Sequence, residues 1–520
     1  MSAPSQGTES VRALRTNEKY AQMTPRSLYQ SVAQFHENPQ LLAFSITPKG
    51  NLVLWATVLV VLGLTPYLSP VPLPYLPLFP LLILAQQFPA RRIEMMGFGV
   101  GGLFLFHRLV QLHVTHLFWF VLDAALVVGM LYIFFTIAQS FARLPRLVRN
   151  NPQIFLHLLL WCGILVLAGL PAGFREDPSW VIASNLSVCC LFFAFLIWRI
   201  GFMLYSGKRG SIQKTGFVDH LIYCLPYLGS TQVPYGKGLD YLLPKLAESR
   251  LDLAKAQLAG VKLLLLAYLW RIILLVLDVA FFGTFGTHGQ IVDVPSPLCL
   301  RLYHIDGLID LSTQHMPTMA IVWASLIVDM VYETMQLAII GHVIIGCLRL
   351  FGFNVFRNTY KPLLSTSLIN FWNRYYYYFK ELLVDFFFFP TYLSFFKHRP
   401  RLRIFAATMA SAFLGNFYYH LLQHFDGFIE SGEALSFVKF YSYFFYSFVL
   451  GIGIFISILR EQNQRGKPVV ASSPGRTFWV TLRKIAGVWL FFSMLRIWDH
   501  PGSAFMQDTT FFFAIWGIHF

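Results

Sequence analysis

Three polar side chains lie four residues apart near the end of an apolar stretch. Asn416, His420 and His424 fall at positions i, i+4 and i+8, which places them on one face of a helix. A neutral imidazole can accept a proton near pH 7, so His420 is a candidate general base. Two histidines four apart can also bind a metal ion, but no His-Glu-x-x-His motif and no clear third ligand accompany them. We therefore expect a base at this position and no metal site.

Two carboxylates form a second candidate group in an earlier apolar stretch. Asp329 and Glu333 are four residues apart and share a helix face. Ionisable residues inside a membrane are costly and mark functional sites by default. The two carboxylates could share a proton or bind a cation. Alternatively, they could be structural and pair with Arg349, Arg357 or a neighbouring helix.

A third candidate group lies in an aromatic segment between residues 366 and 396. Trp372, Asn373 and Arg374 are embedded among its aromatic rings, and basic clusters bound the segment at both ends. A single membrane span would leave one of these clusters on the outer side, against the usual distribution of positive charge. The pattern therefore predicts a re-entrant or broken helix. Such backbone is tolerated at membrane depth only inside protein or along a wet cavity.

The elements that must position these groups are membrane helices. The chain has 520 residues, of which 56% are hydrophobic and 12% charged, with a net charge of +15. Too few polar side chains remain to cover a soluble protein of this size. The composition excludes a soluble enzyme and a disordered chain. It predicts an all-α, polytopic bundle of about 12 or 13 membrane segments, including re-entrant or broken helices. The apolar stretches that predict these segments are 51–88, 95–107, 114–140, 153–171, 179–203, 260–284, 316–348, 366–396, 404–425, 437–459, 478–497 and 503–520.

Apolar stretches and charged clusters divide the chain into four parts. We expect a cytoplasmic tail with amphipathic stretches at 1–48, membrane helices at 49–300 with a cytoplasmic loop at about 206–258, a core at 301–425 that carries the three candidate groups, and further membrane helices at 426–520. The alternation of basic clusters places both termini in the cytoplasm. We expect an integral protein of the bacterial inner membrane that contacts the lipid bilayer and binds no nucleic acid.

The order and spacing of these groups resembles the membrane-bound O-acyltransferase family. The layout is most similar to its bacterial branch of alginate O-acetyltransferase-like and D-alanyl-transfer-like proteins, over roughly residues 316–425. The matching stretches are, in order, Asp329–Glu333, Gly352–Pro362, Ser367–Arg374 and Ser411–His420. That branch usually has Trp-His where this chain has Tyr375-Tyr376, and Trp-His-Gly where it has Tyr-His-Leu around His420.

The resemblance implies an acyltransferase core and a specific reaction. An acyl group such as acetyl would move from a cytoplasmic thioester to a hydroxyl of a glycan, lipid or other secreted acceptor. His420 would be the general base, and the amide of Asn373 would orient the acceptor or donate to the developing oxyanion. The co-substrate would be an acyl-CoA or acyl-carrier thioester, with no tightly bound cofactor, and an extracytoplasmic acyltransferase could be a partner. The residues expected to contact substrate are Trp372, Arg374, Asn416, Tyr419, His424, Asp329 and Glu333.

Two other functions fit the same residues. A transporter or flippase for an amphiphile would use Asp329 and Glu333 as a proton relay, although the sequence shows none of the internal repeats common in transporters. A non-catalytic scaffold of the same layout would explain the nonstandard flanks of the motifs. The enzyme depends on His420, whereas the transporter depends on Asp329.

Overall fold

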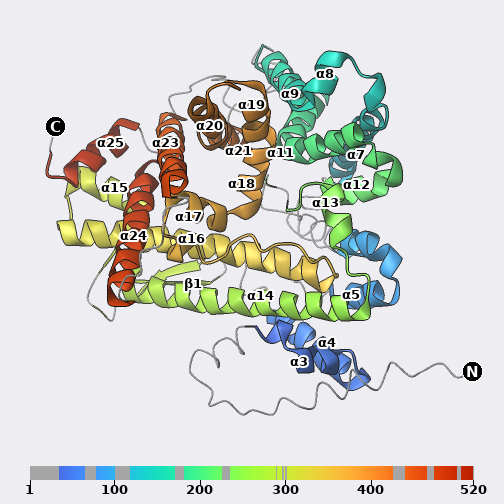
Figure 1. The fold of residues 1–520 in the computed structure, drawn as a ribbon, viewed down its shortest axis with the longest axis horizontal. Coiled ribbons are helices and arrows are strands. Elements are labelled where there is room, and N and C mark those ends of the chain that lie inside the picture. Colours follow the sequence, from blue (N-terminus) through green and yellow to red (C-terminus); the bar gives the residue numbers. More distant parts are fainter. Residues whose placement is uncertain are drawn as a thin grey trace, which may run out of the picture.

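The computed structural model describes most of the chain, in several ranges. These are residues 34–64, 76, 78–99, 117–169, 181–224, 233, 235–287, 290–294, 298, 301–424, 440–464, 474–499 and 505–518. Within them, helices form nearly all of the regular structure (Figure 1). The exception is a short antiparallel hairpin of β1 (Thr284–Thr287) and β2 (Gln290–Asp293).

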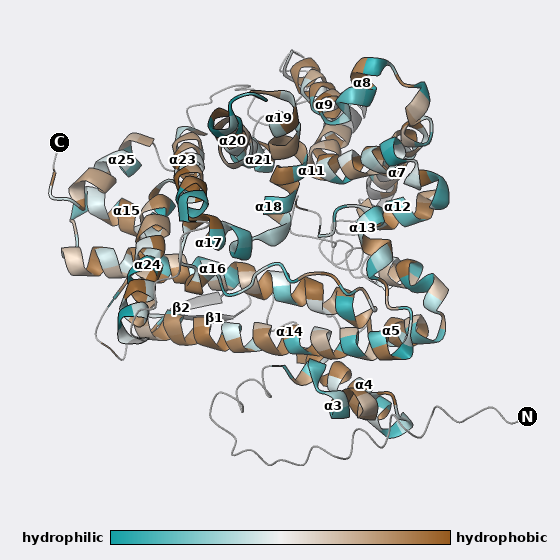
Figure 2. Ribbon diagram, in the orientation of Figure 1, coloured by the Kyte–Doolittle hydropathy of each residue, from teal (hydrophilic) through white to brown (hydrophobic). Residues whose placement is uncertain are grey.

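Six helices in the described part of the chain are long and apolar enough to cross a membrane. A seventh span is formed if α3 (Pro39–Ser45) and α4 (Pro48–Leu64), which meet at a 94° bend, are counted together. Figure 2 shows apolar residues along most of one of the six, α14. The chain is therefore a helical integral membrane protein. The six helices are α7 (Leu117–Gln139), α11 (Val181–Arg209), α14 (Arg250–Leu277), α16 (Met319–Leu350), α23 (Tyr441–Gln464) and α24 (Pro474–Leu495).

The predicted count of about 12 or 13 membrane segments is not reached by long helices among the described residues. Two shorter apolar helices, α5 (Leu78–Gln87) and α9 (Pro152–Gly169), add to the six. The predicted segment at 503–520 holds only the ten-residue α25 (Phe505–Ala514). The predicted segment at 95–107 lies mostly outside the described residues. The predicted count included partial and broken segments, which the length of a full span does not capture.

The remaining helices are short connections between the long ones. They are α8 (Arg146–Asn150), α12 (Phe217–Cys224), α13 (Leu239–Leu242), α15 (Ile305–Gln314), α20 (Pro400–Thr408) and α21 (Asn416–Gln423). A π-helix at Met409–Gly415 joins α20 to α21, so the predicted 404–425 segment is one interrupted helical run. A second π-helix, at Asp278–Phe282, follows α14.

The long helices α14 and α16 lie side by side along one edge of the molecule (Figure 1). They are antiparallel, because Gln257 near the start of α14 donates to the carbonyl of Leu350 at the end of α16. Helix α14 begins earlier than predicted. The side chain of Ser249 accepts from the backbone of Asp252 at 3.0 Å and caps the helix there, so the predicted loop at 206–258 is shorter at its end.

Glycine allows α14 and α16 to approach closely. A Cβ atom added at Gly260 would lie 2.8 Å from the carbonyl oxygen of Gly346, which is backbone and cannot rotate away. We expect Gly260→Ala to lower the free energy of unfolding by about 1–3 kcal/mol, the usual cost of overpacking. Unfolding of the purified protein in mixed detergent micelles measures this. Gly129→Ala is the matched control, because its Cβ would meet nothing within 4 Å, and equal losses in both variants would contradict the explanation.

The aromatic segment at 366–396 is broken, as predicted. The break between its first two helices, at Tyr376, is closed by Asn358. The carbonyl of Asn358 accepts from Tyr377 N at 2.9 Å, and its side-chain oxygen accepts from Tyr378 N at 3.3 Å. Backbone groups at the break are thus satisfied inside the protein, as membrane depth requires. The pieces are α17 (Leu368–Tyr375), α18 (Tyr377–Leu383), a π-helix at Val384–Phe388 and α19 (Phe389–Ser394).

Candidate functional site

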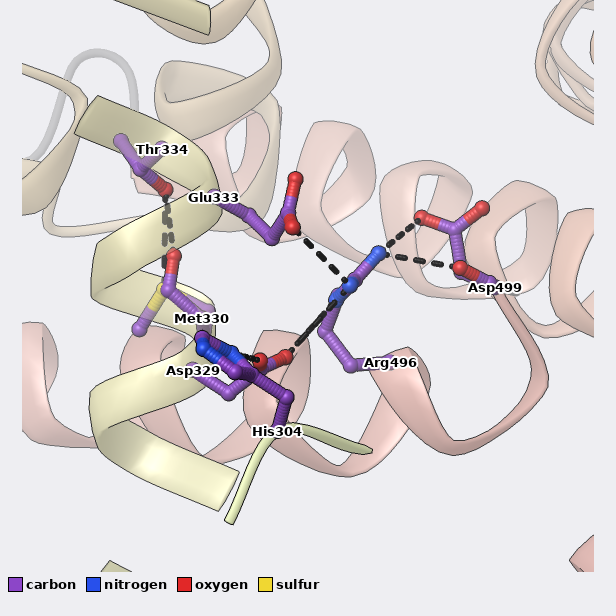
Figure 3. Close-up of polar contacts among 7 residues, drawn as sticks. All are labelled: His304, Asp329, Met330, Glu333, Thr334, Arg496 and Asp499. Atoms are coloured by element: carbon purple, nitrogen blue, oxygen red, sulfur yellow. Dashed lines mark hydrogen bonds and ion pairs between the residues drawn. The ribbon is translucent and has the colours of Figure 1, made fainter. Parts of the chain in front are cut away.

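A group of ionisable side chains from distant parts of the sequence meets beside α16. We call it the polar core, and Figure 3 shows all five of its members. Arg496 lies between two carboxylates on α16 and a third carboxylate just beyond the end of α24. The members are His304, Asp329, Glu333, Arg496 and Asp499.

Arg496 is the centre of the polar core. It is the first residue of a short 3-10 helix, Arg496–Trp498, that directly follows α24. Its Nε and Nη2 atoms each lie 3.4 Å from Asp329 Oδ2, and Nη2 lies 3.6 Å from Glu333 Oε1. Its Nη1 atom donates to the carbonyl of Asp499 at 2.9 Å and lies 3.4 Å from Asp499 Oδ2. One guanidinium therefore binds three carboxylates and fixes the chain end that carries Asp499 (Figure 3).

Asp329 is fully engaged within the polar core. Its side chain is 2% exposed, and Oδ1 lies 3.0 Å from Nδ1 of His304 while Oδ2 faces Arg496. The imidazole of His304 stacks on Phe282 with ring centroids 3.9 Å apart. Both oxygens of Asp329 have partners, so this carboxylate has a structural role: it holds His304 and Arg496 in place. Of the three predicted partners, Arg349 and Arg357 form no ion pair with Asp329 in the described ranges, and the pairing with a neighbouring helix is formed through Arg496 at the end of α24. Glu333 differs, with 38% of its side chain exposed.

His420 lies at the edge of the polar core. Its Nε2 atom is 4.0 Å from Asp499 Oδ1. The ring stacks on Tyr443, with centroids 4.2 Å apart and planes 16° apart, and Tyr446 meets it edge-on. Within the described part of the chain, the buried Nδ1 atom of His420 has no hydrogen-bond partner. One ring nitrogen therefore lies near a carboxylate, while the other is buried.

The helix face predicted for Asn416, His420 and His424 is present in the structure. Helix α21 begins at Asn416, and the rings of both histidines pack against Tyr443. Asn416 is 1% exposed, and its side chain lies beside the hydroxyl of Tyr446. This buried carboxamide is one helical turn from His420, so its amide is placed to act on a group bound at the same face.

The predicted pairing of Asn373 with His420 is not formed. Helix α17 buries Phe371 against Phe492, with ring centroids 3.9 Å apart, and Trp372 against Phe379. The next side chain, Asn373, is consequently exposed. No hydrogen bond or ion pair links it to His420 in the ranges that the structure describes.

The other predicted substrate-contacting residues take up several positions. Trp372 reaches the His420 region indirectly, because Phe379 also packs on Tyr419 with centroids 4.5 Å apart. Tyr419 is 6% exposed, and its hydroxyl accepts from Gln423 at 3.0 Å. The carbonyl of Arg374 accepts from Tyr360 N, which ties the end of α17 to the preceding loop.

Sequence reasoning missed three members of the polar core: His304, Arg496 and Asp499. A usable signal existed for two of them. Arg496 and Asp499 are ionisable residues three apart at the end of an apolar stretch, where charges mark functional sites by default. His304 carries no such signal, since it lies outside the apolar stretches.

The comparisons with known proteins do not assign the chain to a family. No protein-family model matches the chain, and no curated protein sequence matches it. Among the residues that the structure describes, no group of three or more His, Cys, Asp or Glu side chains could hold a metal ion. The functional argument therefore depends on the geometry of the polar core and on the motifs.

Proposed function

We propose that this protein is a membrane-embedded acyltransferase with the layout of the membrane-bound O-acyltransferase family. It moves an acyl group from a cytoplasmic thioester to a hydroxyl of a glycan, lipid or other secreted acceptor. The observation that carries the proposal is the environment of His420, which has a carboxylate 4.0 Å from one ring nitrogen while the other ring nitrogen is buried. This is the arrangement that a general base requires.

His420 acts as the base in the proposed reaction. In the tautomer that carries its proton on Nε2, 4.0 Å from Asp499 Oδ1, the Nδ1 atom is unprotonated and able to accept a proton. The acceptor hydroxyl gives its proton to Nδ1 as its oxygen attacks the thioester carbonyl carbon. The C–S bond then breaks, and the proton on His420 passes to the departing thiolate, which leaves as a thiol. Asp499 stabilises the imidazolium that exists between these two transfers.

The amide of Asn416 takes the role that the motif pattern assigned to Asn373. Its Nδ2 atom is buried and lies one helical turn from His420. A preorganised amide donor stabilises the negative oxygen of a tetrahedral intermediate. Asn373 lacks this placement, because its side chain is exposed.

Arg496 is a positioning residue in this reaction. It binds Asp499 through both the carbonyl and the carboxylate, and it is itself held by Asp329 and Glu333 on α16. This support fixes Asp499 beside His420. A transporter would need Asp329 to exchange a proton, and its two engaged oxygens do not favour that role.

Release of free thiol from acetyl-coenzyme A tests the proposed function. The full-length protein is reconstituted with a total membrane extract that supplies acceptor hydroxyls, and the released thiol is measured with a chromogenic disulfide. We expect thiol release that depends on both protein and extract. If acetyl, medium-chain and long-chain thioesters of coenzyme A and of acyl carrier protein all remain intact, the proposal is wrong.

Asp499→Asn tests the carboxylate beside His420. The substitution keeps the shape and a hydrogen-bond acceptor for Arg496 but removes the charge that stabilises the imidazolium. We expect kcat to fall by about 10²-fold while KM for the thioester stays nearly unchanged, because Asp499 acts on the transition state. Asp499→Glu should restore part of kcat. A rise in KM with unchanged kcat would contradict this role.

A further inference from the structure

Four basic side chains gather where α14, the end of α16 and the loop at 351–361 meet. We call them the cation cluster: Lys262, Arg349, Arg357 and Lys361. Lys262 Nζ lies 3.4 Å from Nδ1 of His36 in the short 3-10 helix Phe35–Glu37, which packs on α14. Burial first, and then the charges of Lys262, Arg349 and Arg357 against that of Glu37, lower the pKa of His36 to about 4. Arg357 and Lys361 both lie over the ring of Tyr360.

The cation cluster has no carboxylate partner. Across the described ranges, none of its four members forms an ion pair with Asp or Glu. Arg349 donates from Nε and Nη2 to the carbonyl of Val355, at 3.1 and 2.7 Å. The guanidinium of Arg357 lies over the ring of Tyr360, 4.4 Å from its centroid. These contacts orient the cations without neutralising them.

Glu37 does not neutralise the cluster. Its carboxylate lies 3.6 Å from Nε2 of His36, and its single negative charge faces four positive ones. Partly buried like charges repel strongly, because the local dielectric is far below that of water. An anion bound among the four cations would offset this repulsion.

A ligand can reach the cation cluster. The side chains of Lys361 and Tyr360 are exposed, with Tyr360 44% exposed, while Lys262, Arg349 and Arg357 are half-buried. A guanidinium presents a planar fork that matches the oxygens of a phosphate, and lysine adds a flexible point charge. The chemistry that fits two arginines, two lysines and an exposed ring is a phosphate group.

We propose that the cation cluster binds a phosphate group of a ligand. The shared chemistry is a phosphomonoester or diphosphate, and it has two sources. One is a soluble nucleotide such as the phosphorylated adenosine portion of coenzyme A, and the other is the headgroup of an acidic phospholipid. Identification of the soluble ligand as the acyl donor rests on the proposed function, whereas the phosphate site does not.

The loop that carries Arg357 and Lys361 connects the cation cluster to the polar core. Tyr360 N donates to the carbonyl of Arg374, and Thr359 Oγ1 donates to the carbonyl of Tyr375 at 2.9 Å. Glu333, Arg496 and Asp499 are the charged neighbours of Tyr375. A phosphate bound at the cation cluster would therefore contact a loop that is hydrogen-bonded to Arg374 and Tyr375, next to the polar core.

Binding of adenosine 3′,5′-diphosphate and of inorganic pyrophosphate tests the proposal. The full-length protein is purified in neutral detergent, and binding is measured by microscale thermophoresis. A second arm measures retention of phosphatidylglycerol by native mass spectrometry. We expect Arg357→Gln and Lys361→Gln each to weaken binding by about tenfold, the effect of losing one charge-assisted contact. Arg401→Gln removes an exposed arginine outside the cluster and should change nothing.

The outcomes separate the two sources. Loss of nucleotide binding in the cluster variants supports a soluble ligand, and loss of lipid retention alone supports a headgroup. The proposal is overturned if wild-type protein binds neither, if the cluster variants bind as wild type does, or if Arg401→Gln loses as much affinity. Binding should persist in His420→Gln, so a failure of the transfer reaction and a failure of the phosphate site are distinguishable.

Discussion

His420→Gln is expected to slow acyl transfer by about 10²–10⁴-fold, the range that a positioned general base contributes. Glutamine approximates the size of histidine and preserves the packing against Tyr443, but it cannot accept a proton from the acceptor hydroxyl. KM for the thioester should change little, because the imidazole acts on the acceptor and not on donor binding. Thiol release at saturating donor measures the effect.

His315→Gln is the matched control for this variant. His315 is exposed at the end of α15, so the same substitution there should leave transfer at the wild-type rate. Both variants should keep the wild-type melting temperature. Full activity in His420→Gln would remove His420 as the base, and an equal loss in His315→Gln would show that the assay responds to something other than the site.

Local sequence patterns predicted the long helices well. The apolar stretches at 114–140 and 316–348 correspond to α7 and α16 within a few residues at each end. A predominantly apolar stretch of this length forms a helix in a membrane even where it carries one or two carboxylates, because a helix satisfies every backbone group internally. The pattern placed the start of α14 about ten residues late, because Lys255 interrupts the apolar run although the helix continues through it.

The face of α21 was predictable for the same local reason. Asn416 and His420 are four residues apart, and helical geometry alone brings them together. The polar core was not predictable in this way. Asp329 and Arg496 are 167 residues apart in sequence, and their contact depends on how α24 crosses α16. Helix packing over such separations leaves no periodic signal in a single sequence.

The assignment of Asn373 shows a limit of motif reasoning. The motif fixes residue order, but the side of the helix that faces the site depends on which neighbours are buried. Here Phe371 and Trp372 take the buried side of the eight-residue α17, and Asn373 is left exposed. Asn416 is the buried carboxamide near His420, and its role follows from burial and not from the motif.

Arg496→Met should lower the free energy of unfolding by about 3 kcal/mol, the lower end of the cost of leaving a buried charge without its partner. Methionine fills a similar volume, so the loss comes from charge and not from a cavity. Asp329 would keep only His304, while Glu333 and Asp499 would lose their cation. Denaturation in mixed micelles measures the change. Arg483→Met, an exposed arginine on the same helix, is the control and should shift stability by less than about 0.5 kcal/mol.

The double variant Arg496→Met, Asp329→Asn separates charge from packing. If the cost of Arg496→Met comes from an unpaired carboxylate, neutralising Asp329 should recover part of it, with a coupling of about 1–3 kcal/mol between the two positions. If the losses of unfolding free energy in the two single variants add up to the loss in the double variant, Arg496 contributes packing alone. In that case the polar core would not hold Asp499 through charge, and the carboxylate beside His420 would need another support. Recovery of stability without recovery of transfer is the expected pattern, because Asp499 would still lack the guanidinium that fixes its position.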